Sequence, residues 1–278
     1  MTENSSLLQE KYGAYDTIEG RQSGWRAHAR EYLAEFLGTF LLVVFGLGVN
    51  NEVSLNGGAR GDWLSVNLGW GIGLLIGASA SAGVSGGHLN PAVTLTMAWF
   101  GNLPWSKVPG YIIAQTVGAF VAAVVVFMLY YPLYNVIDPT RTKAQGFYAT
   151  YPADHIPNAN AFFTEFFGTA MLLLGIFAIT DAHNAPASTS STPVQLMLLL
   201  TGLGICFGSN TGYALNPARD FGPRVMTAFF GWGFEVFTYS DGYFWIPLVA
   251  PCFGGIAGGY IYKFCVQNLH PQNHYDTL

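Results

Sequence analysis

Three long stretches without a charged side chain constrain this chain most strongly. They are Val108–Tyr130, Gln195–Pro217 and Tyr243–Tyr262. About 20 apolar residues are enough for a helix to cross the hydrocarbon layer of a bilayer. The composition agrees, since 51% of the 278 residues are hydrophobic and only 10% are charged, against about 25% in soluble domains. The chain is therefore predicted to be an all-α integral membrane protein, and the alternating segments of a transmembrane barrel are missing.

We expect six membrane-spanning helices and two shorter helical segments. The spans cover residues 31–49, 64–83, 108–131, 161–180, 193–209 and 243–264. The shorter segments, 87–100 and 216–230, are apolar but cannot cross, because a dozen helical residues extend only about 18 Å.

The two halves of the chain repeat each other. Glu35-Phe36-Leu37-Gly38-Thr39 recurs 130 residues later as Glu165-Phe166-Phe167-Gly168-Thr169, and Leu-Asn-Pro-Ala occurs at 89–92 and again at 215–218. Each half thus holds three spans and one half-helix. Three is an odd number, so the second half enters the membrane from the opposite side, and the fold is an inverted repeat.

Each Leu-Asn-Pro-Ala motif predicts a helix start, because Asn is a favoured N-cap and Pro fits the first helical turn. The two half-helices are then expected to meet near the membrane midplane, N-terminus to N-terminus. Each N-terminus carries about +0.5 charge. Facing ends would repel cations, while the amides of Asn90 and Asn216 could donate hydrogen bonds to a passing oxygen.

Basic residues predict the orientation, because cytoplasmic connections are enriched in Lys and Arg. They favour cytoplasmic termini, with tails at 1–30 and 268–278 and a channel domain at 31–267. The repeats cover 31–131 and 161–267, and the connection 132–160 is expected to be extracellular.

The chain resembles the aquaporin (major intrinsic protein) family over about residues 30–267. The paired motifs, the repeated Glu-Phe-x-Gly-Thr and the run from Asn216 to Arg224 carry the resemblance. It implies an aquaporin-like right-handed bundle, a plasma-membrane location and a homotetramer with one pore per subunit. It also implies that the central constriction is formed by Asn90, Pro91, Ala92, Asn216, Pro217 and Ala218.

The resemblance further implies a selectivity filter, formed by Trp70, Gly204, Tyr213 and Arg219. Strict water channels usually carry His and a smaller residue in this set, whereas the present pattern is similar to glycerol facilitators. Arg219 is costly at membrane depth unless it lines water or is paired. An apolar corner opposite Arg219 would suit a linear polyol.

Two further groups of residues are expected to support the pore. Carbonyls on the non-helical stretches before the caps should line it, at Gly86, Gly87, His88, Leu89, Gly212 and Ala214. Non-helical backbone is tolerated at membrane depth where it lines a water-filled cavity. Buried polar side chains should brace these stretches and the filter: Glu35, Glu165, Asp220 and Arg224.

The sequence therefore predicts a passive channel for glycerol, other small uncharged polyols or urea-like solutes, and water, which excludes protons and ions. We expect no enzymatic activity, cofactor, metal or nucleic-acid partner. The alternatives are a strict water channel and, less favoured, an ion-coupled transporter, since transporters also use inverted repeats and broken helices. An intramembrane hydrolase would need a nucleophile with its base or a metal motif, and neither occurs.

Overall fold

The computed structural model describes residues 24–271, and these form an all-helical bundle without strands. The longer helices are α2 (Gly24–Ser54), α3 (Trp63–Ser85), α5 (Val108–Ile137), α6 (Asn158–Thr180), α7 (Thr192–Phe207) and α10 (Ile246–Cys265). The half-helices are α4 (Pro91–Trp99) and α8 (Pro217–Thr227). The remaining turns are η1 (Trp105–Lys107), η2 (Ala144–Phe147), η3 (Ala228–Trp232), η4 (Phe234–Phe237), α9 (Tyr239–Gly242), η5 (Tyr243–Trp245) and η6 (Gln267–Leu269).

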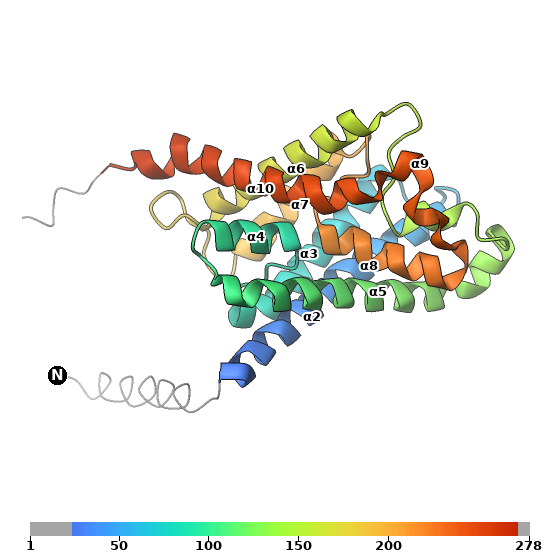
Figure 1. Ribbon diagram of the computed structural model, residues 1–278, viewed down its shortest axis with the longest axis horizontal. Helices are drawn as coiled ribbons and strands as arrows, with labels where there is room; N and C mark the ends of the chain where they lie inside the picture. Colours follow the sequence, from blue (N-terminus) through green and yellow to red (C-terminus); the bar gives the residue numbers. More distant parts are fainter. Residues whose placement is uncertain (1–23, 272–278) are drawn as a thin grey trace, which may run out of the picture.

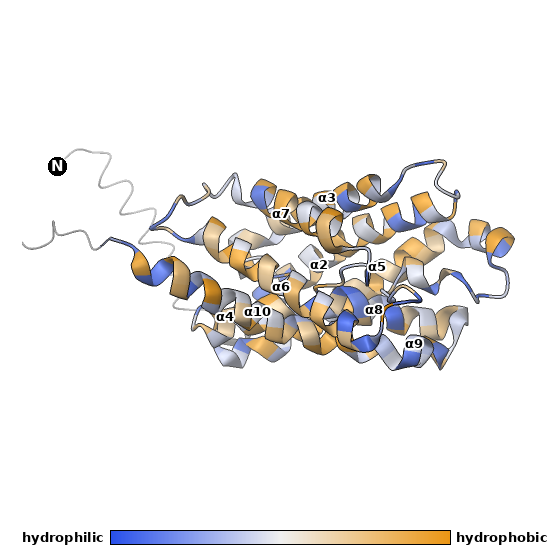
Figure 2. Cartoon of the chain, turned by 90° about the horizontal axis from the view of Figure 1, so that it is seen from above, coloured by the Kyte–Doolittle hydropathy of each residue, from blue (hydrophilic) through white to orange (hydrophobic). Residues whose placement is uncertain are grey.

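Five helical stretches are long and apolar enough to cross a membrane: His28–Ser54, Trp63–Ser85, Trp105–Ile137, Asn158–Thr180 and Tyr239–Leu269. Apolar residues run along most of the bundle, as Figure 2 shows. The sixth expected span, α7, has only 16 residues. It is short because the chain leaves the helix after Phe207 and continues inward as non-helical backbone toward α8.

The first helix starts earlier than the sequence suggested. We expected a span from residue 31 and a tail over 1–30, but α2 already begins at Gly24. The rest of that tail, residues 1–23, and residues 272–278 of the second tail lie outside the described residues. The start of α2 and the end of α10 lie on the same side of the bundle, at the left of Figure 1.

The half-helices α4 and α8 begin near the centre of the bundle and extend to opposite sides (Figure 1). α8 is shorter than expected, since regular helix ends at Thr227 and non-helical φ/ψ values follow at Phe230 and Gly231. Non-helical backbone precedes each half-helix. We name residues 86–89 the first lead and residues 212–215 the second lead.

Close contacts between helices repeat from one half to the other. A Cβ atom added to Gly118 on α5 would lie 2.5 Å from the Phe36 carbonyl oxygen. One added to Gly254 on α10 would lie 2.1 Å from the Phe166 carbonyl oxygen. Both are far below van der Waals contact, so glycine is what lets these helix backbones approach. The repeat in the sequence is therefore a repeat in packing.

Candidate functional site

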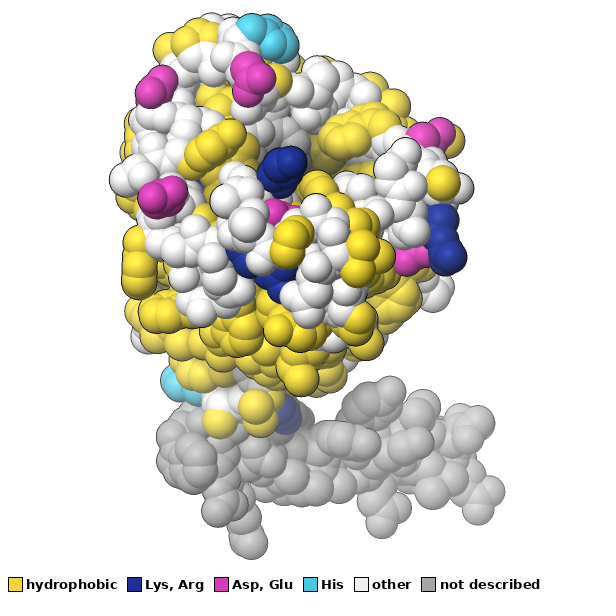
Figure 3. All heavy atoms as spheres, turned by 90° about the vertical axis from the view of Figure 1, so that its right-hand side faces the viewer, with side chains coloured by type: hydrophobic (Ala, Val, Ile, Leu, Met, Phe, Trp, Pro, Cys, Tyr) yellow, Lys and Arg dark blue, Asp and Glu magenta, His cyan; other side chains and the backbone are white. Residues whose placement is uncertain are grey.

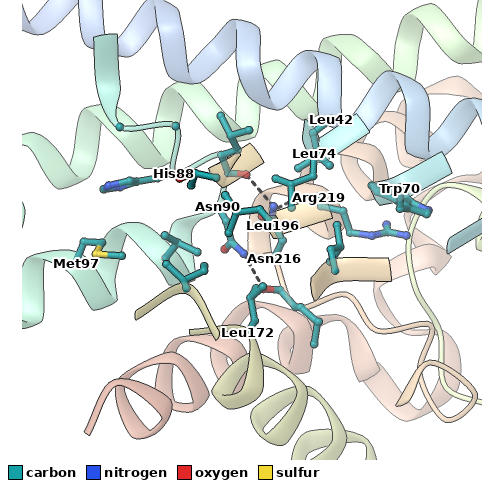
Figure 4. Close-up of a pocket in the computed structure, with 18 of the residues that line it drawn as sticks. Leu42, Trp70, Leu74, His88, Asn90, Met97, Leu172, Leu196, Asn216 and Arg219 are labelled. Atoms are coloured by element: carbon teal, nitrogen blue, oxygen red, sulfur yellow. Dashed lines mark hydrogen bonds between the residues drawn. The ribbon is translucent and has the colours of Figure 1, made fainter. Parts of the chain in front are cut away.

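The two half-helices are joined at their N-termini by reciprocal hydrogen bonds. Asn90 Nδ2 donates to the Leu215 carbonyl at 2.9 Å, and Asn216 Nδ2 donates to the Leu89 carbonyl at 2.8 Å. Each Asn Oδ1 also caps its own helix by accepting from the N–H of Ala92 or Ala218. A carboxamide has two N–H donors, so each Asn keeps one. Both side chains line the same cavity, where Figure 4 shows them facing each other.

Each lead is held by one buried glutamate. Glu35 accepts from the backbone N–H of His88 at 2.9 Å and of Leu89 at 2.7 Å. Glu165 accepts from the N–H of Ala214 at 3.0 Å and of Leu215 at 2.8 Å. The carboxylates thereby satisfy N–H groups that have no helical partner. At the end of each lead, the carbonyl of Leu89 or Leu215 accepts from the Asn side chain of the other half-helix.

Hydroxyl and amide side chains complete the two carboxylate sites. Ser85 and Gln115 donate to Glu35 at 2.6 and 2.8 Å. Thr211 donates to Glu165 at 2.7 Å. Gln115 and Thr211 are not among the site residues predicted from the sequence. The Ala-x-x-x-Gly pattern around Gln115, which is echoed before Gly254, is the signal that could have indicated the former.

The leads are held in an unfavourable backbone conformation. Leu89, Tyr213 and Leu215 have φ values of 53°, 41° and 51°, in the left-handed region that side chains rarely adopt. Such residues cost about 1–3 kcal/mol each and persist only where surrounding contacts determine them. Hydrogen bonds from the Leu89 and Leu215 N–H groups to the glutamates, and from the Tyr213 N–H to Thr211 Oγ1, supply those contacts.

A passage runs along the leads as two cavities that meet at three residues. One cavity, of about 180 Å³, lies along both leads and extends to Thr180 and Thr192. The other, of about 530 Å³, opens on the opposite side, where Figure 3 shows a hollow with a basic side chain in it. Trp70, Tyr213 and Arg219 line both cavities. These three side chains therefore mark the boundary between the two halves of the passage.

Arg219 is held by a carbonyl and an aromatic ring rather than by a carboxylate. Its Nη1 donates to the Tyr148 carbonyl at 2.9 Å, and its guanidinium carbon lies 4.3 Å from the centre of the Trp70 ring. Figure 4 shows these two side chains beside each other. Trp70 is fixed in turn, since its Nε1 donates to Asn50 Oδ1 at 3.0 Å. The Arg219 side chain retains donors that face the passage.

Gly204 lies behind the passage and lines neither cavity. A Cβ atom there would lie 1.9 Å from Asn67 Oδ1 and 2.5 Å from Tyr213 Cζ. The space beside Gly204 is thus occupied by the Asn67 amide and the Tyr213 ring. The missing side chain at Gly204 gives that ring room beside α7.

Asp220 and Arg224, one turn apart on α8, form a buried ion pair. Arg224 Nη2 lies 2.9 Å from Asp220 Oδ1, and neither side chain is exposed. Arg224 also donates to the carbonyls of Val236 and Thr150, and Asp220 accepts from the Thr150 N–H at 2.7 Å. The pair therefore ties α8 to the chain segments around residues 150 and 236.

The other predicted residues lie at different places around the two cavities. Lining the first cavity are Gly86, Gly87, His88, Leu89 and Ala214, whereas Gly212 lines the second. Pro91, Ala92, Pro217 and Ala218 are buried in the first turns of the half-helices and line neither. The His88 ring contacts Thr94 Oγ1 at 3.2 Å through Nδ1. Within residues 24–271, no cluster of three or more His, Cys, Asp or Glu side chains could hold a metal.

Residues 23–262 match the model of the family described as Major intrinsic protein. The chain is 47% identical to Aquaglyceroporin-2 of Rhizophagus irregularis over 276 residues, covering 93% of this chain and 87% of that protein. It is 40% identical to Aquaporin-6 of Laccaria bicolor over 268 residues, covering 91% and 86%. It is also similar to the X-ray structure of the aquaglyceroporin from Plasmodium falciparum, with a TM-score of 0.80, 36% identity, and coverage of 87% of this chain and 98% of that one.

Proposed function

Because the chain belongs to the major intrinsic protein family, we propose that it is a passive membrane channel for glycerol, other small uncharged polyols or urea-like solutes, and water. The observation that carries the proposal is the composition of the boundary between the cavities. Trp70 and Tyr213 offer apolar ring surface, and Arg219 offers hydrogen-bond donors. A polyol has carbon atoms along one side and hydroxyls along the other, so it matches both surfaces at once.

Cations are excluded by fixed charge along the passage. The N-termini of α4 and α8 meet beside the cavity, and each carries about half a positive charge. Arg219 adds a full charge at the boundary. Protons meet the same barrier, and a line of water molecules would be interrupted where Asn90 and Asn216 donate to a passing oxygen. The lead carbonyls accept hydrogen bonds from solute hydroxyls on either side.

The alternatives have less support. Ion coupling needs groups that change occupancy, and both deep glutamates already accept hydrogen bonds from their leads. A strict water channel needs a narrower, more polar boundary than one built from Trp70 and Tyr213. The domain limits given above, plasma-membrane location, cytoplasmic termini and a homotetramer remain part of the proposal and rest on family membership.

Stopped-flow light scattering on liposomes with purified protein tests the function. We expect the protein to raise both water and glycerol permeability well above empty liposomes, with no glycerol accumulation when a proton gradient is imposed. Passage of water without glycerol would make the protein a strict water channel. Proton-driven accumulation of glycerol would make it a coupled transporter.

A pair of glycine variants on α7 tests the proposed filter. Gly204→Ala places a methyl group within 2.5 Å of Tyr213 Cζ, so the ring must move toward the passage. We expect glycerol permeability to fall at least tenfold, which is about 1.4 kcal/mol in barrier height, and water permeability to fall less. Gly202→Ala is the control, because nothing lies within 4 Å of a Cβ atom at that position. Equal losses of water and glycerol in Gly204→Ala would contradict the proposed filter.

A further inference from the structure

The Tyr213 ring lies in a groove on α7 that two glycines create. Cβ atoms added to Gly204 and Gly208 would lie 2.5 Å from Tyr213 Cζ and 2.8 Å from Tyr213 Cδ1. Trp63, in the first turn of α3, packs edge-on against the ring with centroids 5.9 Å apart. These contacts fix the plane of the ring but do not bind its hydroxyl.

The Tyr213 hydroxyl is buried and has no hydrogen-bond partner, and the same is true of Asn67 Oδ1. Asn67 is fully buried on α3, and its Nδ2 donates to the Trp63 carbonyl at 2.7 Å. Its Oδ1 and Tyr213 Cζ lie 1.9 and 2.5 Å from one point, the Cβ position of Gly204. The oxygen and the ring carbon are therefore no farther apart than the sum of those distances.

An unpartnered donor thus lies next to an unpartnered acceptor at the bottom of the groove. Burial without a hydrogen bond is unfavourable for both groups. Tyr O–H can donate, and a carboxamide oxygen can accept. A hydrogen bond between the two groups would satisfy both at once.

We propose that Asn67 is a positioning residue of the filter, which holds the Tyr213 ring in the α7 groove by accepting a hydrogen bond from its hydroxyl. Asn67 itself lines neither cavity, so it acts on the solute only through the ring. The inference rests on the proposed function for its effect on permeation, but the hydrogen bond itself does not depend on which solute passes. Without the bond, the ring can swing away from Gly204 and narrow the passage.

A double-mutant cycle tests the proposal, with Asn67→Leu, Tyr213→Phe and the combined variant. Leu is close to Asn in shape and lacks the acceptor, and Phe lacks only the hydroxyl. We expect each single variant to lower the ratio of glycerol to water permeability about threefold or more. The combined variant should be no lower than either single one, because all three lack the same bond. Effects that multiply in the combined variant, or an unchanged ratio in the single variants, would overturn the proposal.

Thr201→Val is the matched control. Thr201 Oγ1 donates to the backbone carbonyl of Asn67 at 3.3 Å, so this variant disturbs the same contact between α3 and α7 without touching Tyr213. We expect its permeability ratio to equal that of the wild type. An equal fall in Thr201→Val would mean that general loosening of α3 against α7 explains the effect.

The unfolding temperatures of the wild type and the three variants of the cycle give a readout that does not depend on the solute. Loss of one buried hydrogen bond should lower it by roughly 2–4 °C in each single variant, with no further fall in the combined variant. If the wild type passes no glycerol but this coupling is present, the proposed function fails and the positioning contact stands. If glycerol passes and the coupling is absent, the contact fails alone. If the Asn67→Leu protein does not fold, Tyr213→Phe alone still tests the proposal. An unchanged ratio of glycerol to water permeability and an unchanged unfolding temperature in Tyr213→Phe would overturn it.

Discussion

The two repeats share a scaffold but differ in the charges they bury. Asn90 and Asn216 cap equivalent half-helices and bind each other's leads. Glu35 and Glu165 brace those leads through the same two kinds of contact. Yet α4 contains no charged residue, whereas α8 contains Arg219, Asp220 and Arg224.

Under the proposed function, this difference separates the residues that build the passage from those that distinguish solutes. The scaffold is symmetric because both half-helices have to reach the centre, where each Asn cap binds the lead of the other half. A filter needs only one position along a passage, so its charged member can come from one repeat. Burying Arg219 in that repeat then requires further polar contacts around α8.

The largest expected effect follows from breaking the buried ion pair of the second repeat. Arg224→Met removes the cation that faces Asp220 Oδ1 at 2.9 Å and leaves the carboxylate buried and unpaired. Such a loss costs about 3–5 kcal/mol, or roughly 6–20 °C in unfolding temperature for a chain of this size. Thermal unfolding of the purified protein in detergent measures it.

Two variants serve as controls for this prediction. Combining Asp220→Asn with Arg224→Met should restore part of the stability, because no charge then remains buried. Arg60→Met removes an ion pair of the same length, 2.9 Å from Arg60 Nη1 to Glu52 Oε1, but an exposed one. Exposed pairs contribute about 1 kcal/mol or less. If Arg224→Met and Arg60→Met had equal effects, the second repeat would not depend on its buried charges.

The shared scaffold predicts equal effects from the two glutamates. In Glu35→Gln and Glu165→Gln, one carboxylate oxygen becomes an NH₂ group, which leaves one backbone N–H of the lead without an acceptor. The hydroxyls of Ser85 and Thr211, which donate to the carboxylates, can rotate and accept from the new NH₂ group. Each variant should therefore lose about 1–3 kcal/mol of stability, measured by thermal unfolding. A loss of stability in only one variant would show that the two leads do not depend equally on their glutamates.

The sequence predicted the shared scaffold better than it predicted the filter. The helix caps and the repeated glutamates recur in both halves of the sequence, so Asn90 and Glu165 could be predicted from the chain. The place of Gly204 could not, because it depends on a ring that reaches it from the second lead. The contact between Tyr148 and Arg219 joins a long connection to α8, and spacing along the sequence contains no information about it.

The C-terminal ends of α2 and α6, the first helices of the two repeats, also differ in charge. Asn51, near the end of α2, accepts a hydrogen bond from the Tyr134 hydroxyl. Asp181 lies 130 residues later, at the end of α6, and accepts from the Tyr262 hydroxyl at 2.9 Å. Here a third partner joins, since His270 Nε2 lies 2.7 Å from Asp181 Oδ2. A neutral contact in one repeat is thus a charged one in the other, on opposite sides of the bundle.

The smallest expected effect is an acid sensitivity at Asp181, which its counterpart Asn51 cannot contribute because a carboxamide does not titrate. Hydrogen bonds from His270 and then from the His183 N–H lower the pKa of Asp181 to about 2. A carboxyl group with a lowered pKa stabilises the fold above its unfolded value of about 3.9, and that contribution disappears as pH falls toward 2. Asp181→Asn reproduces the neutral contact of the first repeat, so its unfolding temperature should fall less than that of the wild type between pH 4 and pH 2. The difference should be about 1 kcal/mol or less, roughly 2 °C, because the site lies at the end of a helix near solvent.

Asp154→Asn, on an exposed residue of the connection before α6, is the control. Its unfolding temperature should change with pH along the same slope as that of the wild type. Identical slopes for Asp181→Asn and the wild type would mean that the two helix ends are equivalent despite their different charges.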